Sequence, residues 1–341
     1  MTTPALTYDD VLLVPKYSEI KSRTEIDIGN DLDDFIRMSL PIIASPMDTV
    51  CGARMATTVS DVGGLGIIHR YNTVQEQAEL VKNARENATA PFHIGAAVGV
   101  TGDYILRAKA LVDAGAEVVC IDVAHGHHSM VCDAIGALKK EFQGNMHLMA
   151  GNVATVDAYR ALCEWGADSV RVGIGGGSIC STRLQTGHGV PNVTALAECA
   201  ALEYDVPIIA DGGIKNSGDI VKALAVGADF VMVGSLLAGT EEAPGEYVRV
   251  NGHQQKVYRG MASSEAQTEW KGSCTFAEGV STTVPCVGPA STVLEGLRAG
   301  ILSGFSYSGA TTIQQLWMKS ELIRQTGAGQ YESSTHILDR R

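Results

Sequence analysis

Eight short apolar runs recur along the chain, each closing on a stretch with Gly, Asp, Ser or His, and this rhythm constrains the fold more than any other feature. The runs are PIIASPMD, GLGIIHR, FHIGAAVGV, AEVVCIDVAHG, MHLMAGN, SVRVGIG, VPIIADGG and FVMVGS. Runs that are apolar on both faces are typical of parallel strands buried between other layers. Segments with helical spacing lie between them, at 73–87, 104–115, 154–166 and 217–228.

Eight alternating strand and helix units predict an α/β fold of the (β/α)8 TIM-barrel type rather than a doubly wound sheet. The chain of 341 residues fits one such barrel, because these barrels routinely use about 250 residues or more. We therefore expect a single domain over residues 1–341. Active sites of this fold lie on the loops that follow the carboxyl ends of the strands, so the polar run endings predict the rim of a site.

Two connections depart from this pattern. Residues 173–190 follow the sixth run and are rich in glycine, and we expect them to form a mobile catalytic loop. Residues 241–288 follow the eighth run and are too long for a simple connection. Loops of that size are usually functional lids, and we call this segment the flap.

The charge and the cysteines narrow the partners and the compartment. A formal net charge of −12 without a Lys or Arg run argues against a general affinity for nucleic acid or for an anionic membrane. The eight cysteines form no CxxC pair, which is typical of reduced thiols in the cytosol. No secretory leader and no apolar stretch of bilayer length is recognisable, so we expect a cytoplasmic protein outside the membrane.

The stretch RVGIGGGSICST, residues 171–182, allows two interpretations. A dinucleotide fingerprint would need the first strand–helix turn and an acidic residue about 20 positions further on, whereas this stretch follows the sixth run. The interpretation that we prefer is a loop in which three glycines let the backbone approach a ligand. Ser178 then offers a hydroxyl and an amide to a phosphate, and Cys180 is a candidate nucleophile. Taken alone, a cysteine in such a loop is more often structural than catalytic. The residues around it have to show which of the two roles Cys180 has.

Glycines at the next two strand ends favour a phosphate site. IIADGG supplies Gly212 and Gly213, and VMVGS supplies Gly234 and Ser235, at the seventh and eighth strands, where this fold commonly builds phosphate sites. Asp211 can hold two ribose hydroxyls with one carboxylate. Three loops that converge in this way predict a nucleoside monophosphate as the ligand.

At this point the chain resembles the IMP dehydrogenase and GMP reductase family along nearly its whole length. The matching stretches are LTYDDVLLVP, LPIIASPMDTV, GGLGIIHR, AGNVAT, RVGIGGGSICSTR, IIADGGI, MVGSLLAGTEEAPGE, YRGM and TGAG. The resemblance implies a TIM barrel, usually a homotetramer. It also implies that the loop cysteine attacks C2 of a purine nucleoside monophosphate and that a nicotinamide cofactor exchanges hydride at that carbon.

Carried over position by position, the resemblance assigns roles to individual residues. Cys180 resembles the family nucleophile, and Thr182 and Glu278 occupy the positions of the pair that handles ammonia. The implied substrate contacts are Ser45, Met47, Ser178, Asp211, Gly212, Gly213, Gly234, Ser235, Tyr258, Gly260, Met261 and Ala262. The implied cofactor contacts are Asp122, Asn152, Arg70 and Gly173. The backbone carbonyls of Gly175, Gly177 and Cys180 are the implied ligands of a potassium ion.

The second half of the reaction separates the two activities of the family. The dehydrogenase hydrolyses the covalent purine adduct with an Arg-Tyr pair on its flap and uses NAD. The reductase removes ammonia from GMP with a Thr-Glu pair and uses NADPH. Both kinds of enzyme carry that pair, so its presence here permits the reductase without identifying it. Residues 261–285 of the flap contain neither arginine nor tyrosine, and GMASSEA resembles the reductase pattern. We therefore predict a GMP reductase.

Other features leave two alternatives open. GSLLAGTEEAPGE and YRGM resemble the dehydrogenase more closely, so an IMP dehydrogenase that lacks the regulatory module is the main alternative. Residues 81–95 run directly from a predicted helix to a predicted strand, which leaves no room for the regulatory module. Most reductases and some dehydrogenases lack it too. The other alternative is a nucleotide-binding regulator without catalytic activity, which the presence of Cys180, Thr182 and Glu278 disfavours.

Two further side chains are ambiguous from sequence. Arg70 can meet a cofactor phosphate or make an ordinary surface ion pair. Trp270 can stack on a base or anchor the flap. Their surroundings in the fold distinguish these roles.

Overall fold

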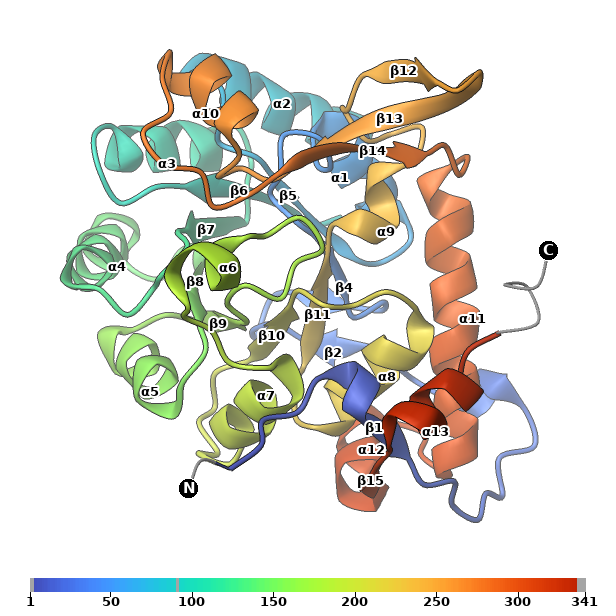
Figure 1. Ribbon diagram of the computed structural model, residues 1–341. Coiled ribbons are helices and arrows are strands. Elements are labelled where there is room, and N and C mark those ends of the chain that lie inside the picture. Colours follow the sequence, from blue (N-terminus) through green and yellow to red (C-terminus); the bar gives the residue numbers. More distant parts are fainter. Residues whose placement is uncertain (1–2, 90–91, 336–341) are drawn as a thin grey trace.

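The computed structural model describes residues 3–89 and 92–335. Eight parallel strands close into a barrel at its centre, in the order β10-β11-β4-β5-β6-β7-β8-β9 (Figure 1). The strands are β4 Ile42–Ala44, β5 Leu65–Ile68, β6 Ile94–Val98, β7 Val118–Asp122, β8 His147–Val153, β9 Ser169–Val172, β10 Ile208–Asp211 and β11 Phe230–Val233. Each lies in one of the eight apolar runs, so the predicted (β/α)8 fold is confirmed.

Helices follow the strands, most of them on the outside of the barrel, while the short helix Thr182–Thr186 lies at the rim (Figure 1). They are α1 Ala53–Asp61, α2 Val74–Asn87, α3 Tyr104–Asp113, α4 Ser129–Phe142, α5 Val156–Trp165, α6 Thr182–Thr186, α7 Asn192–Ala200, α8 Ser217–Ala225 and α9 Ser235–Ala238. Local chemistry fixes their ends. The Thr73 hydroxyl accepts a hydrogen bond from the Glu76 amide, and the Glu76 carboxylate accepts one from the Thr73 amide, which begins α2. Helix α5 ends at Gly166, which has a left-handed backbone (φ 99°).

A short hairpin closes the amino-terminal end of the barrel. It consists of β2 Asn30–Asp31 and β3 Arg37–Met38. Leu32 and Met38 of this hairpin pack in one buried cluster with Phe230 from the barrel interior. The Nδ1 atom of His147 lies 2.7 Å from a carboxylate oxygen of Asp33, which ties the hairpin to β8. This end is therefore filled, and the open rim lies at the carboxyl ends of the strands.

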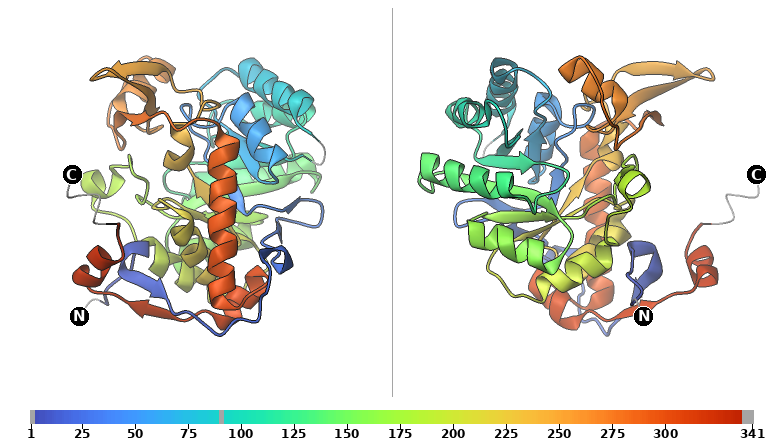
Figure 2. Two further views of the ribbon diagram at one scale, coloured as in Figure 1. Left: turned by 90° about the vertical axis from the view of Figure 1, so that its right-hand side faces the viewer. Right: turned by 60° about the vertical axis from the view of Figure 1, so that its left-hand side comes forward.

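Segments from the two ends of the chain lie side by side. The elements concerned are η1 Tyr8–Asp10, β1 Val11–Leu13, η2 Arg23–Glu25, α11 Ala290–Ser308, α12 Ile313–Lys319, β15 Leu322–Arg324 and α13 Gly327–Glu332. Strand β1 pairs antiparallel with β15, and α11 runs along the outside of the barrel against α8 and α1 (Figure 2). This arrangement brings Tyr8 of η1 against the barrel rim at Gly213.

The flap folds as a small sheet with one helix. Its elements are β12 Tyr247–Val250, β13 His253–Arg259, α10 Ser264–Lys271 and β14 Ser281–Pro285. The three strands pair antiparallel in the order β12-β13-β14. Figure 1 shows this sheet and α10 at the top of the molecule, beside α1 and α2. The flap is thus an ordered layer next to the rim.

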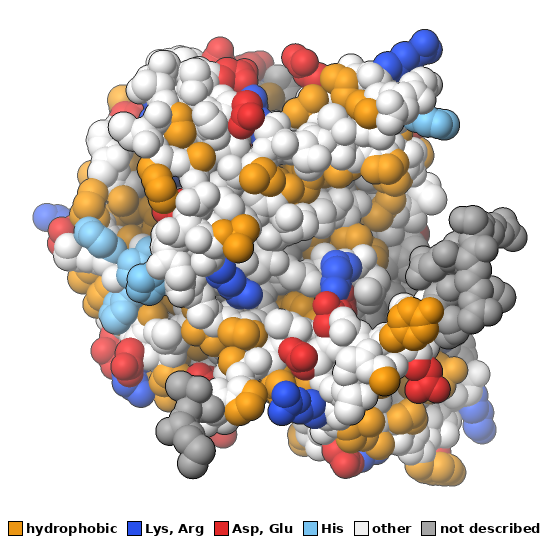
Figure 3. All heavy atoms as spheres, in the orientation of Figure 1, with side chains coloured by type: hydrophobic (Ala, Val, Ile, Leu, Met, Phe, Trp, Pro, Cys, Tyr) orange, Lys and Arg blue, Asp and Glu red, His pale blue; other side chains and the backbone are white. Residues whose placement is uncertain are grey.

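The surface seen in Figure 3 carries scattered basic side chains and no basic patch. Histidine side chains gather at its left edge, over α4 and α5. In the loop before α4, the ring of His127 lies 6.5 Å from that of His125 and 6.0 Å from that of Trp165. None of the helices in the described ranges is long and apolar enough to cross a membrane.

Candidate active site

Two adjoining cavities open at the carboxyl ends of the barrel strands. The larger encloses about 320 Å³ and contains the Cys180 side chain. The smaller encloses about 240 Å³ and contains Ser178, Gly213 and Ser235. Predicted site residues on the wall of the larger cavity are Ser45, Met47, Arg70, Asp122, Asn152, Gly173, Gly175, Gly177, Cys180, Thr182, Tyr258, Gly260, Met261, Ala262 and Glu278. Residues from distant parts of the sequence therefore meet at one site.

The flap and the glycine-rich loop are joined by backbone hydrogen bonds at Cys180. The Ser181 amide donates to the Glu278 carbonyl at 2.9 Å, and the Val280 amide donates to the Ile179 carbonyl at 3.0 Å. Cys180 and Gly279 form the bridge between the two segments. The loop thus holds the thiol directly beneath the flap.

Thr182 and Glu278 face the same cavity as the thiol. The Cys180 thiol donates a hydrogen bond of 3.2 Å to the Thr182 hydroxyl. Glu278 is half-buried, and among residues 3–89 and 92–335 its carboxylate has no hydrogen-bond or ion-pair partner. A hydroxyl beside the sulfur and an unpaired carboxylate across from it can pass protons to a reacting group.

Four residues converge where β11 ends at Gly234. A Cβ atom at this position would lie 3.1 Å from the Met47 sulfur, 3.3 Å from the Tyr258 hydroxyl and 3.7 Å from the Ser45 Cβ. Any side chain here would fill the space between these groups. Burial raises the pKa of the Tyr258 phenol, and hydrogen bonding to Ser178 opposes that rise. The phenol is therefore a hydrogen-bond donor at neutral pH.

The backbones of two loops approach closely at Gly212. Its φ of 89° is left-handed, and a Cβ atom there would lie 3.0 Å from the backbone of Gly176 and Gly177. The Asn192 side chain bridges the same turn by donating to the carbonyls of Asp211 (2.9 Å) and Gly212 (2.6 Å). The contact places Ser178, Gly213 and Ser235 on one small cavity, as a phosphate cradle requires.

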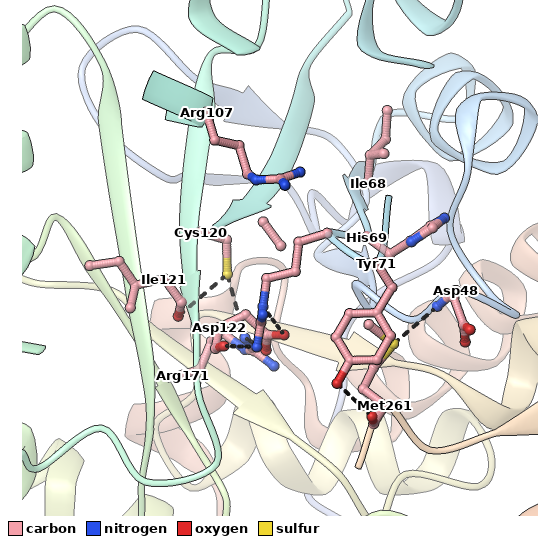
Figure 4. A network of polar contacts seen from close by, with 12 residues as sticks. Asp48, Ile68, His69, Tyr71, Arg107, Cys120, Ile121, Asp122, Arg171 and Met261 are labelled. Carbon is pink, nitrogen blue, oxygen red and sulfur yellow. Dashed lines mark hydrogen bonds and ion pairs between the residues drawn. The ribbon is translucent and has the colours of Figure 1, made fainter. Parts of the chain in front are cut away.

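A buried arginine that the sequence analysis did not single out organises the cavity floor. Arg171 donates to Asp122 at 2.8 Å (Figure 4) and to Asp211 at 2.9 Å. Burial lowers the pKa of Arg171, but the nearby negative charges raise it well above its ordinary value. The Asn152 amide donates to the same Asp211 oxygen at 2.7 Å, and the other Asp211 oxygen has no hydrogen bond to a described side chain. Asp211 lies behind the two cavities and is not among the residues of their walls. A charged residue inside the apolar run SVRVGIG was the signal that could have revealed Arg171.

Arg70 and Trp270, whose roles the sequence left open, both have partners within the protein. Arg70 donates to the Asp122 carbonyl at 3.1 Å and lies 3.7 Å from its carboxylate, inside the cavity wall rather than on the open surface. Trp270 stacks on Tyr71 with ring centres 5.6 Å apart, so it anchors α10 to the loop after β5. The Tyr71 hydroxyl also donates to the Met261 carbonyl at 2.8 Å (Figure 4).

Gly260, Met261 and Ala262 connect β13 to α10 and form the flap side of the cavity. The Met261 sulfur accepts from the Asp48 amide at 3.3 Å. Of the carbonyls expected to bind potassium, that of Gly177 accepts from the Cys180 amide at 3.1 Å. A carbonyl has two lone pairs, so this bond leaves room for a cation.

Comparisons with known proteins agree with this arrangement. Residues 5–336 match the family model described as the IMP dehydrogenase / GMP reductase domain. The inosine-5'-monophosphate dehydrogenase of Cryptosporidium parvum is 37% identical, covering 98% of this chain and 95% of that protein. The GMP reductase of Leishmania donovani is 32% identical, covering 98% and 97%. A crystal structure of a cysteine-to-alanine variant of Trypanosoma brucei GMP reductase with guanosine 5'-monophosphate superposes with a TM-score of 0.92 at 30% identity, covering 98% of each chain.

The relatives also bear on the missing regulatory module. The alignment with the dehydrogenase of Nitrosopumilus maritimus extends over 466 residues and that with the Leishmania donovani reductase over 478, against 341 residues here. Relatives of both names therefore carry segments that this chain lacks. The absence of the module does not separate the two activities among them.

Proposed function

This chain belongs to the family of IMP dehydrogenases and GMP reductases, and from that premise we propose that it is a GMP reductase that converts GMP to IMP and ammonia. The observation that carries the proposal is that residues 261–285 of the flap contain neither arginine nor tyrosine, while Thr182 and the unpaired Glu278 carboxylate lie around Cys180. Only the group that acts on the covalent adduct distinguishes the two reactions, so it outweighs resemblance in the substrate cradle.

The cavities fit a purine nucleoside monophosphate. Ser178, Gly213 and Ser235 would bind the phosphate through hydroxyls and backbone amides, together with Gly212, Gly234 and Tyr258. The free oxygen of Asp211 would accept from the ribose hydroxyls. The purine would then lie between Met47 and the flap residues 260–262, with C2 toward the thiol.

The chain's own groups account for the removal of the amine. The sulfur of Cys180 attacks C2 of GMP and forms the carbon–sulfur bond. Glu278 and Thr182 deliver a proton to the exocyclic amine, the C2–N bond breaks, and ammonia leaves a purine joined to the sulfur as a thioimidate. After reduction at C2 the carbon–sulfur bond breaks, IMP departs and the thiolate is restored.

The arginines that line the larger cavity are already committed to carboxylates. Arg171 lies between Asp122 and Asp211, and Arg70 lies against Asp122. On the flap strand β13, Arg259 is held by Asp48 and Glu269. A guanidinium in such a pair is a poor base for activating water. This arrangement supports amine release over hydrolysis.

The residues near Cys180 also fit a nicotinamide ring. The cavity wall formed by Val123, Ala124 and Ile174 is apolar. The Asn152 side chain donates to the Gly173 carbonyl and to Asp211, so its amide oxygen is the group that it offers to a carboxamide. NADPH, when bound, supplies the hydride to C2 of the purine. We propose Asp122, Asn152, Arg70 and Gly173 as its contacts, and a potassium ion on the carbonyls of Gly175, Gly177 and Cys180.

The specific alternative is an IMP dehydrogenase that uses NAD, which the wording of the cradle segments YRGM and GSLLAGTEEAPGE favours. Purified protein assayed with GMP plus NADPH, and separately with IMP plus NAD, tests the choice. We expect turnover with the first pair. Turnover only with the second pair would replace the reductase assignment with the dehydrogenase. We also expect a cytoplasmic homotetramer. Light scattering coupled to size-exclusion chromatography measures the mass of the assembly, which should be four times that of the chain.

A further inference from the structure

The smaller cavity extends beyond the predicted phosphate cradle. Besides Ser178, Gly213 and Ser235, its lining includes Thr7, Tyr8, Asp9, Arg183, Asn192 and Lys215. Its volume of about 240 Å³ corresponds to roughly eight water molecules in the liquid. A single phosphoryl group on the cradle therefore leaves part of this space unused.

The Tyr8 hydroxyl is buried, and the Asn192 side chain lies near it. Tyr8 is 2% exposed, and neither its hydroxyl nor the Asn192 amide oxygen makes a hydrogen bond of good geometry to a described residue. Burial raises the pKa of the Tyr8 phenol, although Asn192 lies close enough to lower it in part, so the phenol keeps its proton and can donate. Buried polar atoms nearly always have a hydrogen-bond partner, so a hydroxyl at a cavity without such a bond indicates an occupant.

The charges around the cavity favour an anion. The Arg183 guanidinium donates to the carbonyls of Ile174 (3.1 Å) and Val190 (2.8 Å), and no described carboxylate lies within ion-pair distance of it. Lys215 is the second cation, and its Nζ lies 2.6 Å from Asp9. Two cations and one carboxylate thus line the cavity, in a chain whose formal net charge is −12. The carboxylates of Asp211 and Asp219 lie behind this lining, close enough to add to the rise that burial causes in the pKa of Tyr8.

The ion pair of Lys215 and Asp9 is not a barrier to a ligand. The Lys215 side chain is 55% exposed and that of Asp9 is 42% exposed. Exposed ion pairs contribute little to stability, so the ammonium can turn from Asp9 to a phosphate at small cost. A doubly charged phosphate competes well with a carboxylate for such a cation.

We propose that this cavity is a second anion subsite, formed by Tyr8, Arg183 and Lys215, which takes the terminal phosphate of a purine nucleoside diphosphate. The first phosphate of that ligand occupies the cradle of Ser178, Gly213 and Ser235. The inference rests on the proposed function, because it assumes that the cradle holds a purine nucleotide. A diphosphate bound in this way competes with the monophosphate substrate.

Calorimetric titration of the purified full chain with GMP and with GDP tests the proposal. We expect the wild-type protein to bind GDP at least as tightly as GMP. In Tyr8→Phe, which keeps the packed ring, and in Lys215→Ala, at an exposed position, the ratio of the GDP to the GMP dissociation constant should rise at least about fivefold. Lys109→Ala removes another exposed lysine with a carboxylate partner, Glu141, and is the matched control with an unchanged ratio.

Two results would overturn the subsite. One is GDP binding that is tenfold or more weaker than GMP binding in the wild-type protein. The other is a ratio that neither Tyr8→Phe nor Lys215→Ala changes. Both leave the proposed function standing, because GMP still binds. Failure of the wild-type protein to bind any purine monophosphate would instead remove the proposed function, and the subsite with it.

Discussion

At the scale of single residues, Cys180 depends on groups that come from two separate segments. Thr182 lies on the same loop and accepts a hydrogen bond from the thiol, whereas Glu278 reaches the cavity from the flap. The backbone bond from Ser181 to the Glu278 carbonyl fixes that approach. A change at any one of the three reacting groups should therefore affect chemistry more than substrate binding.

Replacing the nucleophile should separate turnover from binding. Cys180→Ala removes the sulfur that forms the covalent bond, so we expect a loss of turnover of at least about 10³-fold. Calorimetric binding of GMP should remain within a few fold of the wild-type value, because the cradle residues are untouched. Normal turnover in this variant would remove Cys180 from the mechanism.

Removing the acid on the flap should slow proton transfer. Glu278→Gln keeps the size of the side chain and loses its titratable group, so kcat with GMP should fall by about 10²- to 10⁴-fold while KM changes little. Glu265→Gln, on the exposed first turn of α10 in the same flap, is the control and should turn over normally. Equal effects of the two changes would mean that Glu278 acts only through flap structure.

A half-buried carboxyl just before β11 gives the stability a pH dependence. Burial raises the pKa of Asp229 to about 6, although the Ile208 amide and the Asn30 side chain donate to it. The folded state therefore holds a proton that the unfolded chain, with an ordinary pKa of 3.8, has already lost. Because the folded state binds more protons in this window, the Asp229 contribution weakens as pH rises from about 4 to about 6, by up to about 3 kcal/mol.

Asp229→Asn isolates this contribution. The free energy of unfolding, measured at several pH values between about 4 and 7, should fall less with rising pH in the variant than in the wild-type protein. Parallel profiles for the two proteins would show that Asp229 ionises with an ordinary pKa in the fold.

At the scale of elements, the flap is held to the barrel by an aromatic pair. Tyr71 and Trp270 stack nearly parallel, at 12°, and Tyr71 also bonds the Met261 carbonyl. Such stacking contributes about 0.5–1.5 kcal/mol beyond burial of the rings. Trp270 and Glu278 lie on the same flap segment. The position of the Glu278 side chain near the thiol therefore depends on the attachment that Trp270 provides.

Trp270→Ala should therefore loosen α10. We expect amide hydrogen exchange in residues 264–271 to speed up about 2- to 12-fold, the factor that corresponds to the stacking energy. Trp317→Ala, at a partly exposed tryptophan on α12, is the control and should leave exchange in α10 unchanged. Unchanged exchange in Trp270→Ala would show that the β-sheet of the flap holds α10 by itself.

At the scale of the whole molecule, the barrel was predictable and part of its site was not. The eight apolar runs alone gave the strands, since their pattern is local and each run ends at the same rim. Arg171 was missed because its role depends on which carboxylates the neighbouring strands bring to it. The sheet of the flap was also missed: β13 reads HQQKVYR, without an apolar pattern, and its Lys256 is buried against the Thr240 carbonyl at 2.9 Å.

The central claim is that the purine adduct on Cys180 arises by departure of an amine from GMP, rather than by loss of hydride from IMP with later attack of water on the adduct. The most direct test is the stoichiometry of ammonia release against NADPH oxidation, with GMP as the substrate and Cys180→Ala as the blank. The account predicts one ammonia and one IMP for each NADPH oxidised. It is contradicted if GMP yields no ammonia while IMP and NAD yield XMP and NADH.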